Sequence, residues 1–514
     1  MKRLVTLLLA AGLVFASTTP ASAIDFKASG QWLMGFSAGD GNLVEKVRQN
    51  GVKNKYNAND KFTAAQRLRL KMEAVASENL SGTVQFEIGD TTWGKAKNSG
   101  ALGADDTCIE VKHAYLDWAV PDTDLKFRMG IQPILMPNYA GGSAILDDDM
   151  AAVVASYQFN ENVGLTFMWG RPYNDNYTGN SNKKNANYMD NIDLFALTLP
   201  LTFDGFKITP WIMYGMIGEN ALKAKNSDGD YVGSSKLFAL SNPSIADGAH
   251  YTTDGYGSGF WGGIAGAITA ADPLNIEFDF NYGYVESMAT VNAYKSSDDV
   301  VRRAELRREG FLLKALVEYK MDWGTPGIFG WYASGDDDNP KNGSERMPSI
   351  SACGNFTSFM GDGNLGWSSS DALYDRELSY AGTWGVGLQV KDMSFLENLT
   401  HTFRVAYWGG TNDPAMAKYF DDVTDWLGGS DAVTNSRHGQ GAPELYLTKM
   451  DSILEFNLVN NYKMYENFNI NFELGYMVNF IDNDTWKKTW NGRKGQGFDS
   501  RDAWKAQLVF AYQF

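Results

Sequence analysis

Two groups of charged residues are the strongest candidates for chemistry in this chain. Three consecutive carboxylates end an unusually apolar connecting segment, and five basic side chains alternate with apolar ones in two other stretches. These are Asp147, Asp148 and Asp149, and Arg67, Arg69, Lys71, Lys126 and Arg128. Opposed charges lining an aqueous passage would select among ions. The alternative for each basic residue is a wall charge in water, compensated by Glu73, Glu87 or Asp117.

The chain has few residues and motifs suited to catalysis or metal binding. The chain has four histidines and neither a GxSxG nor an HExxH sequence. We therefore expect no enzymatic activity, no cofactor and no dedicated metal site. The acidic stretch DDDN at residues 336–339 offers oxygen ligands to calcium, but it lacks the glycine and distant glutamate of an EF-hand. A solvated acidic loop is the better interpretation.

Cys108 and Cys353 are the only cysteines. Both fall in long connecting segments that we place on the same side of the molecule. An oxidising compartment would permit one disulfide between them, and two free thiols are the alternative.

The N-terminal residues favour export. Lys2 and Arg3 precede an apolar run, and Ala21, Ser22 and Ala23 supply small residues for cleavage. This pattern predicts a signal peptide at residues 1–23. Its removal takes two positive charges from a net charge of −16 and leaves −18, which argues against nucleic-acid binding.

The C-terminal stretch predicts a strand with one apolar face. Phe514, Tyr512, Phe510 and Leu508 alternate with mostly polar or small residues, and strand side chains point alternately to opposite faces. The same alternation recurs along the chain. Four segments remain ambiguous in phase, near residues 191–199, 259–269, 327–334 and 380–390. Depending on them, we count eighteen or sixteen strands.

The connections between these strands alternate strictly in length. Eight are short, near residues 76–82, 121–124, 160–162, 200–205, 270–273, 322–325, 391–398 and 463–467. Nine are long, near residues 38–65, 90–108, 133–150, 171–190, 218–258, 286–309, 336–379, 409–444 and 480–502. Short turns on one side and long loops on the other are typical of outer-membrane barrels. We therefore predict an all-β, transmembrane antiparallel barrel, with apolar side chains facing lipid and polar ones facing water.

The predicted barrel forms a single domain over residues 24–514. A tube of eighteen strands is wide, so a further element should narrow it. The third long loop, at residues 133–150, is far more apolar than the others, and packing against the wall would bury those residues. We predict that it folds inward and brings its three carboxylates to the narrowing.

Several stretches resemble the trimeric outer-membrane porins of sulfate-reducing bacteria, related in plan to general diffusion porins. They are IDFKASGQW (24–32), AYLDW (114–118), RMGIQP (128–133), SGDDDNP (334–340) and the terminal Phe514. The resemblance covers the whole chain after residue 23. It implies a homotrimer in the outer membrane of a Gram-negative cell, passive diffusion of small hydrophilic solutes and ions, and an acidic third loop facing a basic wall.

The resemblance also implies partners. Phe514, with Tyr512 and Phe510, matches the terminal aromatic signal read by the outer-membrane assembly machinery, and lipid and lipopolysaccharide would surround the barrel. General porins have sixteen strands, so eighteen is a departure. The alternatives are a substrate-specific eighteen-stranded channel, an outer-membrane structural or adhesive protein, and an outer-membrane hydrolase.

Overall fold

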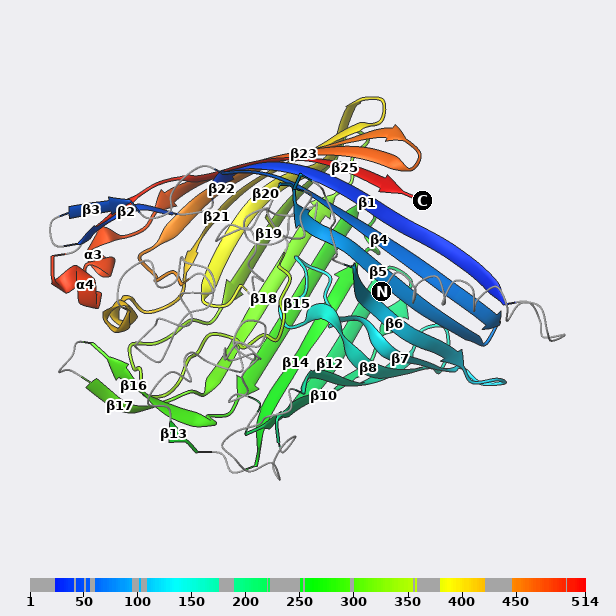
Figure 1. Ribbon diagram of the computed structural model, residues 1–514, viewed down its shortest axis with the longest axis horizontal. Helices are drawn as coiled ribbons and strands as arrows, with labels where there is room; N and C mark the ends of the chain where they lie inside the picture. The colour runs from blue at the N-terminus through cyan, green and yellow to red at the C-terminus, as the bar shows by residue number, and fades with distance from the viewer. Residues whose placement is uncertain are drawn as a thin grey trace.

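Eighteen antiparallel strands form one closed barrel in the computed structural model (Figure 1). The structure describes residues 24–40, 43–49, 52–55, 61–94, 101–102, 109–174, 189–219, 221, 250–252, 255–295, 300–354, 356–357, 380–420, 446–495 and 497–514. The predicted signal peptide at residues 1–23 lies outside these ranges. The prediction of an eighteen-stranded barrel is confirmed, and the four ambiguous segments are all strands.

The barrel strands follow one another in chain order around the wall. They are β1 (Asp25–Asp40), β4 (Lys61–Ser77), β5 (Leu80–Thr92), β6 (Ile109–Ala119), β7 (Leu125–Leu135), β8 (Asp147–Gln158), β9 (Gly164–Asn174), β10 (Asn191–Thr198) with β11 (Leu201–Phe203), β12 (Phe206–Gly218), β14 (Tyr256–Ile268), β15 (Leu274–Val285), β18 (Arg308–Tyr319), β19 (Thr325–Ala333), β20 (Thr383–Leu396), β21 (Leu399–Gly410), β22 (Ser452–Tyr465), β23 (Phe468–Phe480) and β25 (Ala503–Gln513).

β10 and β11 count as one strand of the wall. Both pair with β12 in a single continuous register, from Thr198 opposite Trp211 to Leu201 opposite Ile208. Pro200 separates them because proline has no backbone N–H to donate. The backbone N–H of Leu199 still donates to the carbonyl of Pro210 at 3.0 Å, an ordinary distance for a backbone hydrogen bond.

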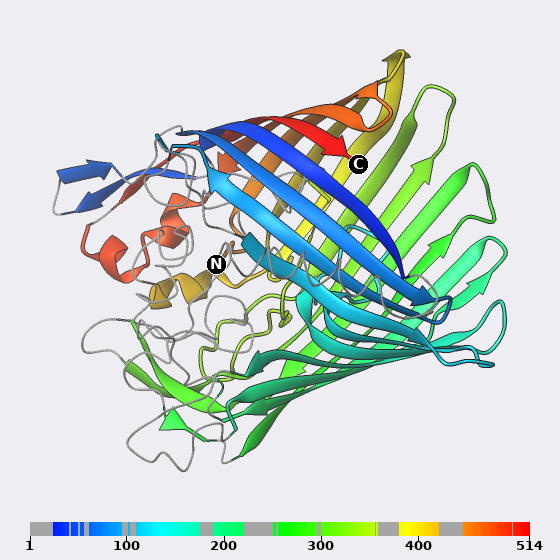
Figure 2. The ribbon, with the colours of Figure 1, turned by 45° about the vertical axis from the view of Figure 1, so that its right-hand side comes forward.

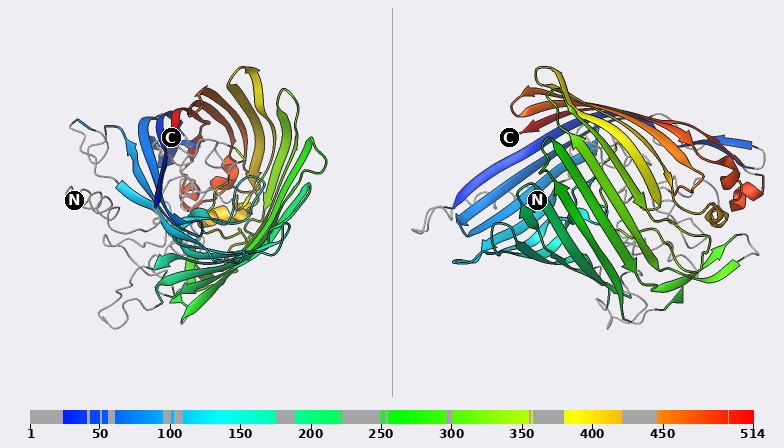
Figure 3. Two further views of the ribbon diagram at one scale, coloured as in Figure 1. Left: turned by 90° about the vertical axis from the view of Figure 1, so that its right-hand side faces the viewer. Right: turned by 180° about the vertical axis from the view of Figure 1, so that it is seen from behind.

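The first and last strands close the barrel. β1 pairs with β25 from Gln31 opposite Gln513 to Asp40 opposite Trp504, and its other edge pairs with β4. The N–H of Gly30 donates to the carbonyl of Phe514 at 2.8 Å, so the pairing reaches the last residue. The end-on view in Figure 3 shows the strands enclosing a central space. Closure leaves no unpaired strand edge along this seam.

Side chains alternate between the outer and inner faces of the wall. In β15, Phe280 is exposed on the outside, whereas its neighbours Asp279 and Asn281 are buried on the inside. In β25, Lys505 and Gln507 are buried, and Leu508 and Phe510 take the opposite face. In these two strands apolar side chains face outward and polar ones face inward, which is the reverse of a soluble barrel and matches one that spans a membrane. Other strands also bury large apolar side chains inside, such as Trp261, Phe329 and Trp408.

The two ends of the barrel differ, as the sequence predicted (Figure 2). One end carries short hairpin turns, and β20 continues to Leu396, so the turn expected at residues 391–398 is only Glu397 and Asn398. The expected turn was too long because Lys391 and Asp392 lie in the strand despite their polarity. The register of the β20–β21 pair shifts at this point.

The other end carries longer connections with structure of their own. One small sheet joins β2 (Val44–Gln49), β3 (Val52–Lys55) and β24 (Phe498–Ser500), and another joins β13 (His250–Tyr251), β16 (Ala289–Tyr294) and β17 (Val300–Glu305). Short helices are η3 (Pro414–Tyr419), α3 (Asn483–Trp486) and α4 (Trp490–Arg493). Among the described residues, no helix has the length and apolarity needed to cross a membrane.

Candidate functional site

The third loop, defined here as residues 136–146, connects β7 and β8. These two strands have 11 and 12 residues, against 17 in β4, so the chain leaves the wall early. The N–H of Met136 donates to the carbonyl of Leu146 at 2.9 Å and closes the base of the loop. Met136, Ala140, Ser143, Ala144, Ile145 and Leu146 are all buried. This burial accounts for the apolar composition of the loop.

The third loop is bonded to a different part of the wall. Asp279 of β15 accepts hydrogen bonds from the backbone N–H groups of Tyr139 and Ala140, at 2.9 and 2.8 Å. Lys314 of β18 donates to the carbonyls of Ala140 and Gly142. In strand order, β15 and β18 stand six places from β7 and β8, so the loop extends across the enclosed space.

Gly141 lies at the tip of the third loop in close contact with aromatic rings. Its φ is +66°, and a Cβ atom there would lie 2.6 Å from the ring of Phe356. The hydroxyl of Tyr380 donates to the carbonyl of Gly141 at 2.7 Å. Phe356 also stacks on Phe329 of β19, with ring centroids 4.9 Å apart. Glycine is required here by both the backbone conformation and the space.

A second segment, residues 344–354 of the connection between β19 and β20, packs along the third loop. The N–H groups of Ile350 and Ser351 donate to the carbonyl of Ile145, at 2.8 and 3.1 Å. Asp147 donates its N–H to the carbonyl of Ser351, and Cys353 donates to the carbonyl of Ser143, both at 2.8 Å. Sequence reasoning did not predict this contact, since nothing in the order of residues relates two loops about 200 positions apart.

The three consecutive carboxylates begin β8 and have different surroundings. Asp147 is exposed, and Asp148 accepts a hydrogen bond from the hydroxyl of Ser351 at 2.9 Å. Asp149 forms an ion pair with Lys112 of β6, and its Oδ1 lies within hydrogen-bond distance, 2.8 Å, of Nε2 of His113. Sequence reasoning missed Lys112 and His113.

Both partners of Asp149 reach it because of a β-bulge. The register of β5 and β6 shifts between Gln85 opposite His113 and Phe86 opposite Val111, which leaves Lys112 as the extra residue. A bulge re-aims side chains locally, so Lys112 and His113, adjacent in sequence, both contact Asp149. The Nδ1 atom of His113 lies 2.7 Å from Oε1 of Gln85.

Two of the five predicted basic residues pair with the acidic residues that the alternative interpretation named. Nε of Arg69 lies 2.6 Å from Oε2 of Glu87 on the neighbouring strand. Arg128 forms two hydrogen bonds with Asp117, at 2.7 and 3.1 Å, and its guanidinium carbon lies 4.3 Å from the ring centre of Tyr115. These residues therefore face the interior as compensated pairs along one arc of the wall.

The other three predicted basic residues share the inner face. Arg67 and Lys71 are half-buried positions two residues before and after Arg69, and Lys126 is exposed near the turn end of β7. Lys126 has no hydrogen bond or ion pair with any residue that the structure describes. Arg67, Arg69 and Lys71 lie on β4 and Asp147, Asp148 and Asp149 on β8, with β5, β6 and β7 between those strands.

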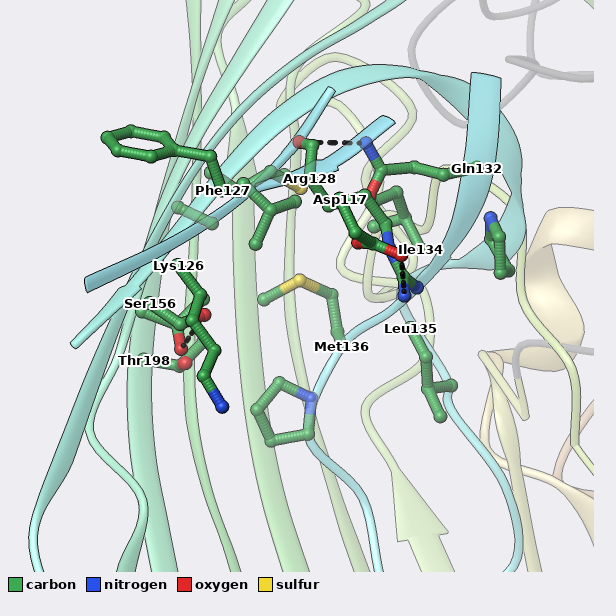
Figure 4. A pocket seen from close by; sticks show the side chains of 16 residues that line it. Asp117, Lys126, Phe127, Arg128, Gln132, Ile134, Leu135, Met136, Ser156 and Thr198 are labelled. Carbon is green, nitrogen blue, oxygen red and sulfur yellow. Dashed lines mark hydrogen bonds and ion pairs between the residues drawn. The ribbon is translucent and has the colours of Figure 1, made fainter. Parts of the chain in front are cut away.

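A cavity of about 410 Å³ lies between the third loop and the wall (Figure 4). Its wall comes from β6 to β10, and its other side comes from residues 134–137. It is lined by Asp117, Lys126, Phe127, Arg128, Gln132, Pro133, Ile134, Leu135, Met136, Pro137, Val154, Ser156, Thr166, Met168, Ala196 and Thr198. The cavity thus combines two of the predicted basic residues with the apolar start of the third loop.

The remaining predicted residues are placed as follows. Phe510 and Tyr512 lie in β25 opposite Met34 and Trp32, and the ring of Phe514 contacts Gly30. Cys353 is half-buried, whereas Cys108 lies outside the described residues, so their pairing stays a prediction. Asp336 is buried and accepts from Ser344 and Tyr446, at 2.6 and 2.8 Å. In the described part of the chain, no group of three or more acidic, histidine or cysteine side chains is arranged to hold a metal.

No family model and no curated protein matches the chain. Among solved structures, it is similar to OccK8 (OprE) of Pseudomonas aeruginosa, with 9% sequence identity, a TM-score of 0.48, and 95% and 98% of the two chains covered. It is also similar to OccK11 (OpdR) of that organism, with 11% identity, a TM-score of 0.46, and 95% and 96% covered. A structure of its OpdK with vanillate has 10% identity, a TM-score of 0.45, and 95% and 98% covered. These likenesses concern the fold alone.

Proposed function

We propose that this protein is an outer-membrane porin, a water-filled channel for passive diffusion of small hydrophilic solutes and ions. The third loop narrows the channel. Transport rather than catalysis is its role, and it needs no cofactor. The chain would be exported by a cleaved signal peptide and inserted by the assembly machinery, which reads Phe514. Outer-membrane lipid and lipopolysaccharide would contact its outer face.

The observation that carries this proposal is the bonding of the third loop to Asp279 and Lys314. A closed barrel with apolar side chains exposed on its outside and charged and polar side chains among those inside supports a passage through a membrane. A loop bonded across that passage reduces its cross-section, as the proposal requires. Charged side chains of β4 to β8 would then influence ions, because charges lining a narrow pore set its selectivity.

A substrate-specific channel is the second candidate, and the cavity beneath the third loop favours it. General diffusion needs an aqueous path and no recess for a solute. A recess of about 410 Å³ falls within the range of small-molecule sites, about 300–1,000 Å³. The two candidates differ in whether a solute saturates the channel.

The resemblance to porins of sulfate-reducing bacteria adds a homotrimer to the proposal. Many large apolar side chains are exposed on the outer face, including Phe260, Leu313 and Tyr332, and provide surface for lipid or for neighbouring barrels. An unheated detergent gel should then show a species of three times the mature mass. A monomer under all mild conditions would contradict the trimer and leave the channel proposal standing.

Planar-bilayer recording tests the channel proposal. Purified protein should produce discrete, ohmic conductance steps, and a salt gradient should reveal its ion preference. An absence of steps from correctly folded, heat-modifiable protein would favour a structural or adhesive role. Hydrolytic activity in the same preparation would favour the enzyme alternative.

A further inference from the structure

The cavity beneath the third loop has a regular construction from two rows of inward-facing side chains. Register places Lys126 opposite Ser156, Ser156 opposite Thr166, and Thr166 opposite Thr198, so four polar side chains form one row. The next row along the strands consists of Arg128, Val154, Met168 and Ala196 in the same order. Directly opposed residues of antiparallel strands share a face, so both rows line the cavity.

The polar row lies close to the turn end of the barrel. Lys126 is the second residue of β7, and Thr198 is the last residue of β10. The hydroxyl oxygens of Ser156 and Thr166 lie 3.1 Å apart. Figure 4 shows Lys126, Ser156 and Thr198 grouped on one side of the cavity. The row therefore presents one ammonium group and neighbouring hydroxyl groups.

The deeper part of the cavity is mainly apolar. Val154, Met168 and Ala196 form its wall, and Ile134, Met136 and Pro137 of β7 and the third loop face them. Met168 and Ala196 are buried. Water in such a recess makes few hydrogen bonds, so a solute with a short apolar part gains by displacing it.

The charges of the cavity sum to one uncompensated cation. Arg128 and Asp117 neutralise each other, because the guanidinium engages both carboxylate oxygens. Among the residues that the structure describes, Lys126 has no such partner, and its side chain is exposed. A cationic solute would meet this ammonium, and Asp117, the only carboxylate among the described lining residues, is already paired with Arg128.

We propose that this cavity is a solute-binding subsite for small organic monoanions with a short apolar body. The anionic head group lies at Lys126 and accepts hydrogen bonds from the hydroxyls of Ser156, Thr166 or Thr198. The apolar body lies against Met168, Val154 and Met136. Carboxylates and sulfonates share this chemistry. The proposal rests on the channel function and names the solute class that the channel would favour.

The size of the cavity agrees with this class. A volume of about 410 Å³ compares with roughly 30 Å³ per molecule in liquid water. It accommodates a solute of several carbon atoms with some water retained around the head group. An inorganic anion such as chloride would use Lys126 but gain nothing from the apolar wall, so length of the apolar body should increase affinity.

Fluorine NMR of detergent-solubilised protein tests the subsite. The probe is 4,4,4-trifluorobutyrate, which carries the label at its apolar end, with trifluoroacetate, 4,4,4-trifluorobutanol and 4,4,4-trifluorobutylammonium as matched probes. Transverse relaxation, corrected with empty micelles, should increase most for trifluorobutyrate, and unlabelled butyrate should reverse the increase. Equal responses from the alcohol or the ammonium probe would overturn the charge argument.

Variants assign the response to the cavity. Lys126→Met should weaken trifluorobutyrate binding roughly tenfold, as expected for a lost charge-assisted hydrogen bond. Lys126→Arg should retain binding. Lys207 of β12 is a matched control, because it is also exposed near the turn end and does not line the cavity. Unchanged binding in Lys126→Met, or an equal loss in Lys207→Met, would overturn the subsite.

Bilayer recording on the same preparations separates the two proposals. Butyrate should reduce the wild-type current in a saturable manner, and Lys126→Met should abolish that saturation. Conductance without trifluorobutyrate binding would contradict the subsite alone. Binding without conductance would support the subsite and contradict the channel function.

Discussion

Asp279 and Lys314 are directly opposed in β15 and β18, and together they hold the backbone of the third loop. The Nζ atom of Lys314 lies 3.2 Å from Oδ2 of Asp279, and the two side chains are 0% and 1% exposed. Asp279 accepts from two loop N–H groups, and Lys314 donates to two loop carbonyls. The pair therefore satisfies its own charges while bonding a segment about 140 residues before Asp279 and about 174 residues before Lys314.

Loss of one member of this ion pair should destabilise the protein more than loss of both. Lys314→Met leaves the Asp279 carboxylate buried and unpaired, which typically lowers the free energy of unfolding by about 3–5 kcal/mol. Asp279→Asn with Lys314→Met removes both charges, so the double variant should lose less than the sum of the single ones. A double-mutant cycle from urea unfolding in detergent measures this coupling. Strict additivity would show that the two side chains act independently.

Gly141→Ala should displace the tip of the third loop. Alanine at a φ of +66° is strained by roughly 1–2 kcal/mol, and its Cβ would overlap the Phe356 ring. Conductance and current noise should both rise. Gly94→Ala is the matched control, since Gly94 also has a positive φ, +82°, but no atom lies within 4 Å of an added Cβ. Equal conductance in both variants would show that the tip of the third loop does not restrict the passage.

Replacing the charged residues of the wall should change ion preference in opposite directions. Asp147, Asp148 and Asp149 changed together to Asn should shift the reversal potential towards anions, because Lys112 loses its acidic partner. Arg69→Ala with Arg128→Ala should shift it towards cations, because Glu87 and Asp117 lose theirs. Charges act on passing ions within a Debye length, about 8–10 Å at physiological salt.

Charge-preserving changes provide the control for that experiment. Arg69→Lys with Arg128→Lys keeps the net charge of the wall and should leave the reversal potential in a tenfold salt gradient near the wild-type value. If neither the acidic nor the basic replacements change the reversal potential, these charged residues lie outside the path of the ions.

Deleting residues 510–514 should prevent assembly. The deletion removes the β25 residues that pair with Met34, Leu33, Trp32 and Gln31, together with the backbone bonds between Phe514 and Gly30. β1 and β23 would then keep unpaired edges in lipid, where each unsatisfied backbone group costs several kcal/mol. We expect protease-sensitive material that lacks a heat-modifiable band. Normal insertion of the truncated chain would contradict closure through this seam.

The sequence was sufficient to predict the barrel but not the contacts between residues inside it. Strand phase follows from alternation that any one strand displays, as in Phe280 beside Asp279, and loop lengths are visible directly. The partners of Asp149 could not be predicted, because they depend on a β-bulge at Lys112 that no pattern in the sequence indicates. The contact of Ile145 with Ile350 and Ser351 depends on how two loops fold in a shared space.

Pairing of Arg69 with Glu87 and of Arg128 with Asp117 was foreseeable as an alternative. Opposed residues on neighbouring strands come close together once the register is known, and a one-residue error in register would have separated each pair. The sequence placed these residues on the inner face, while the choice between compensated pairs and a field across the passage required the register of β4 to β7.

The central claim, that the third loop narrows a water-filled channel, is tested most directly by single-channel conductance after deletion of residues 138–144. The deletion removes every loop backbone group that Asp279 and Lys314 bind. A Gly-Ser replacement of residues 44–55, which contain β2 and β3, shortens a different loop as the control. The account predicts a clear rise in conductance for the first variant and a wild-type value for the second. Unchanged conductance after the third-loop deletion, in a correctly inserted barrel, would contradict it.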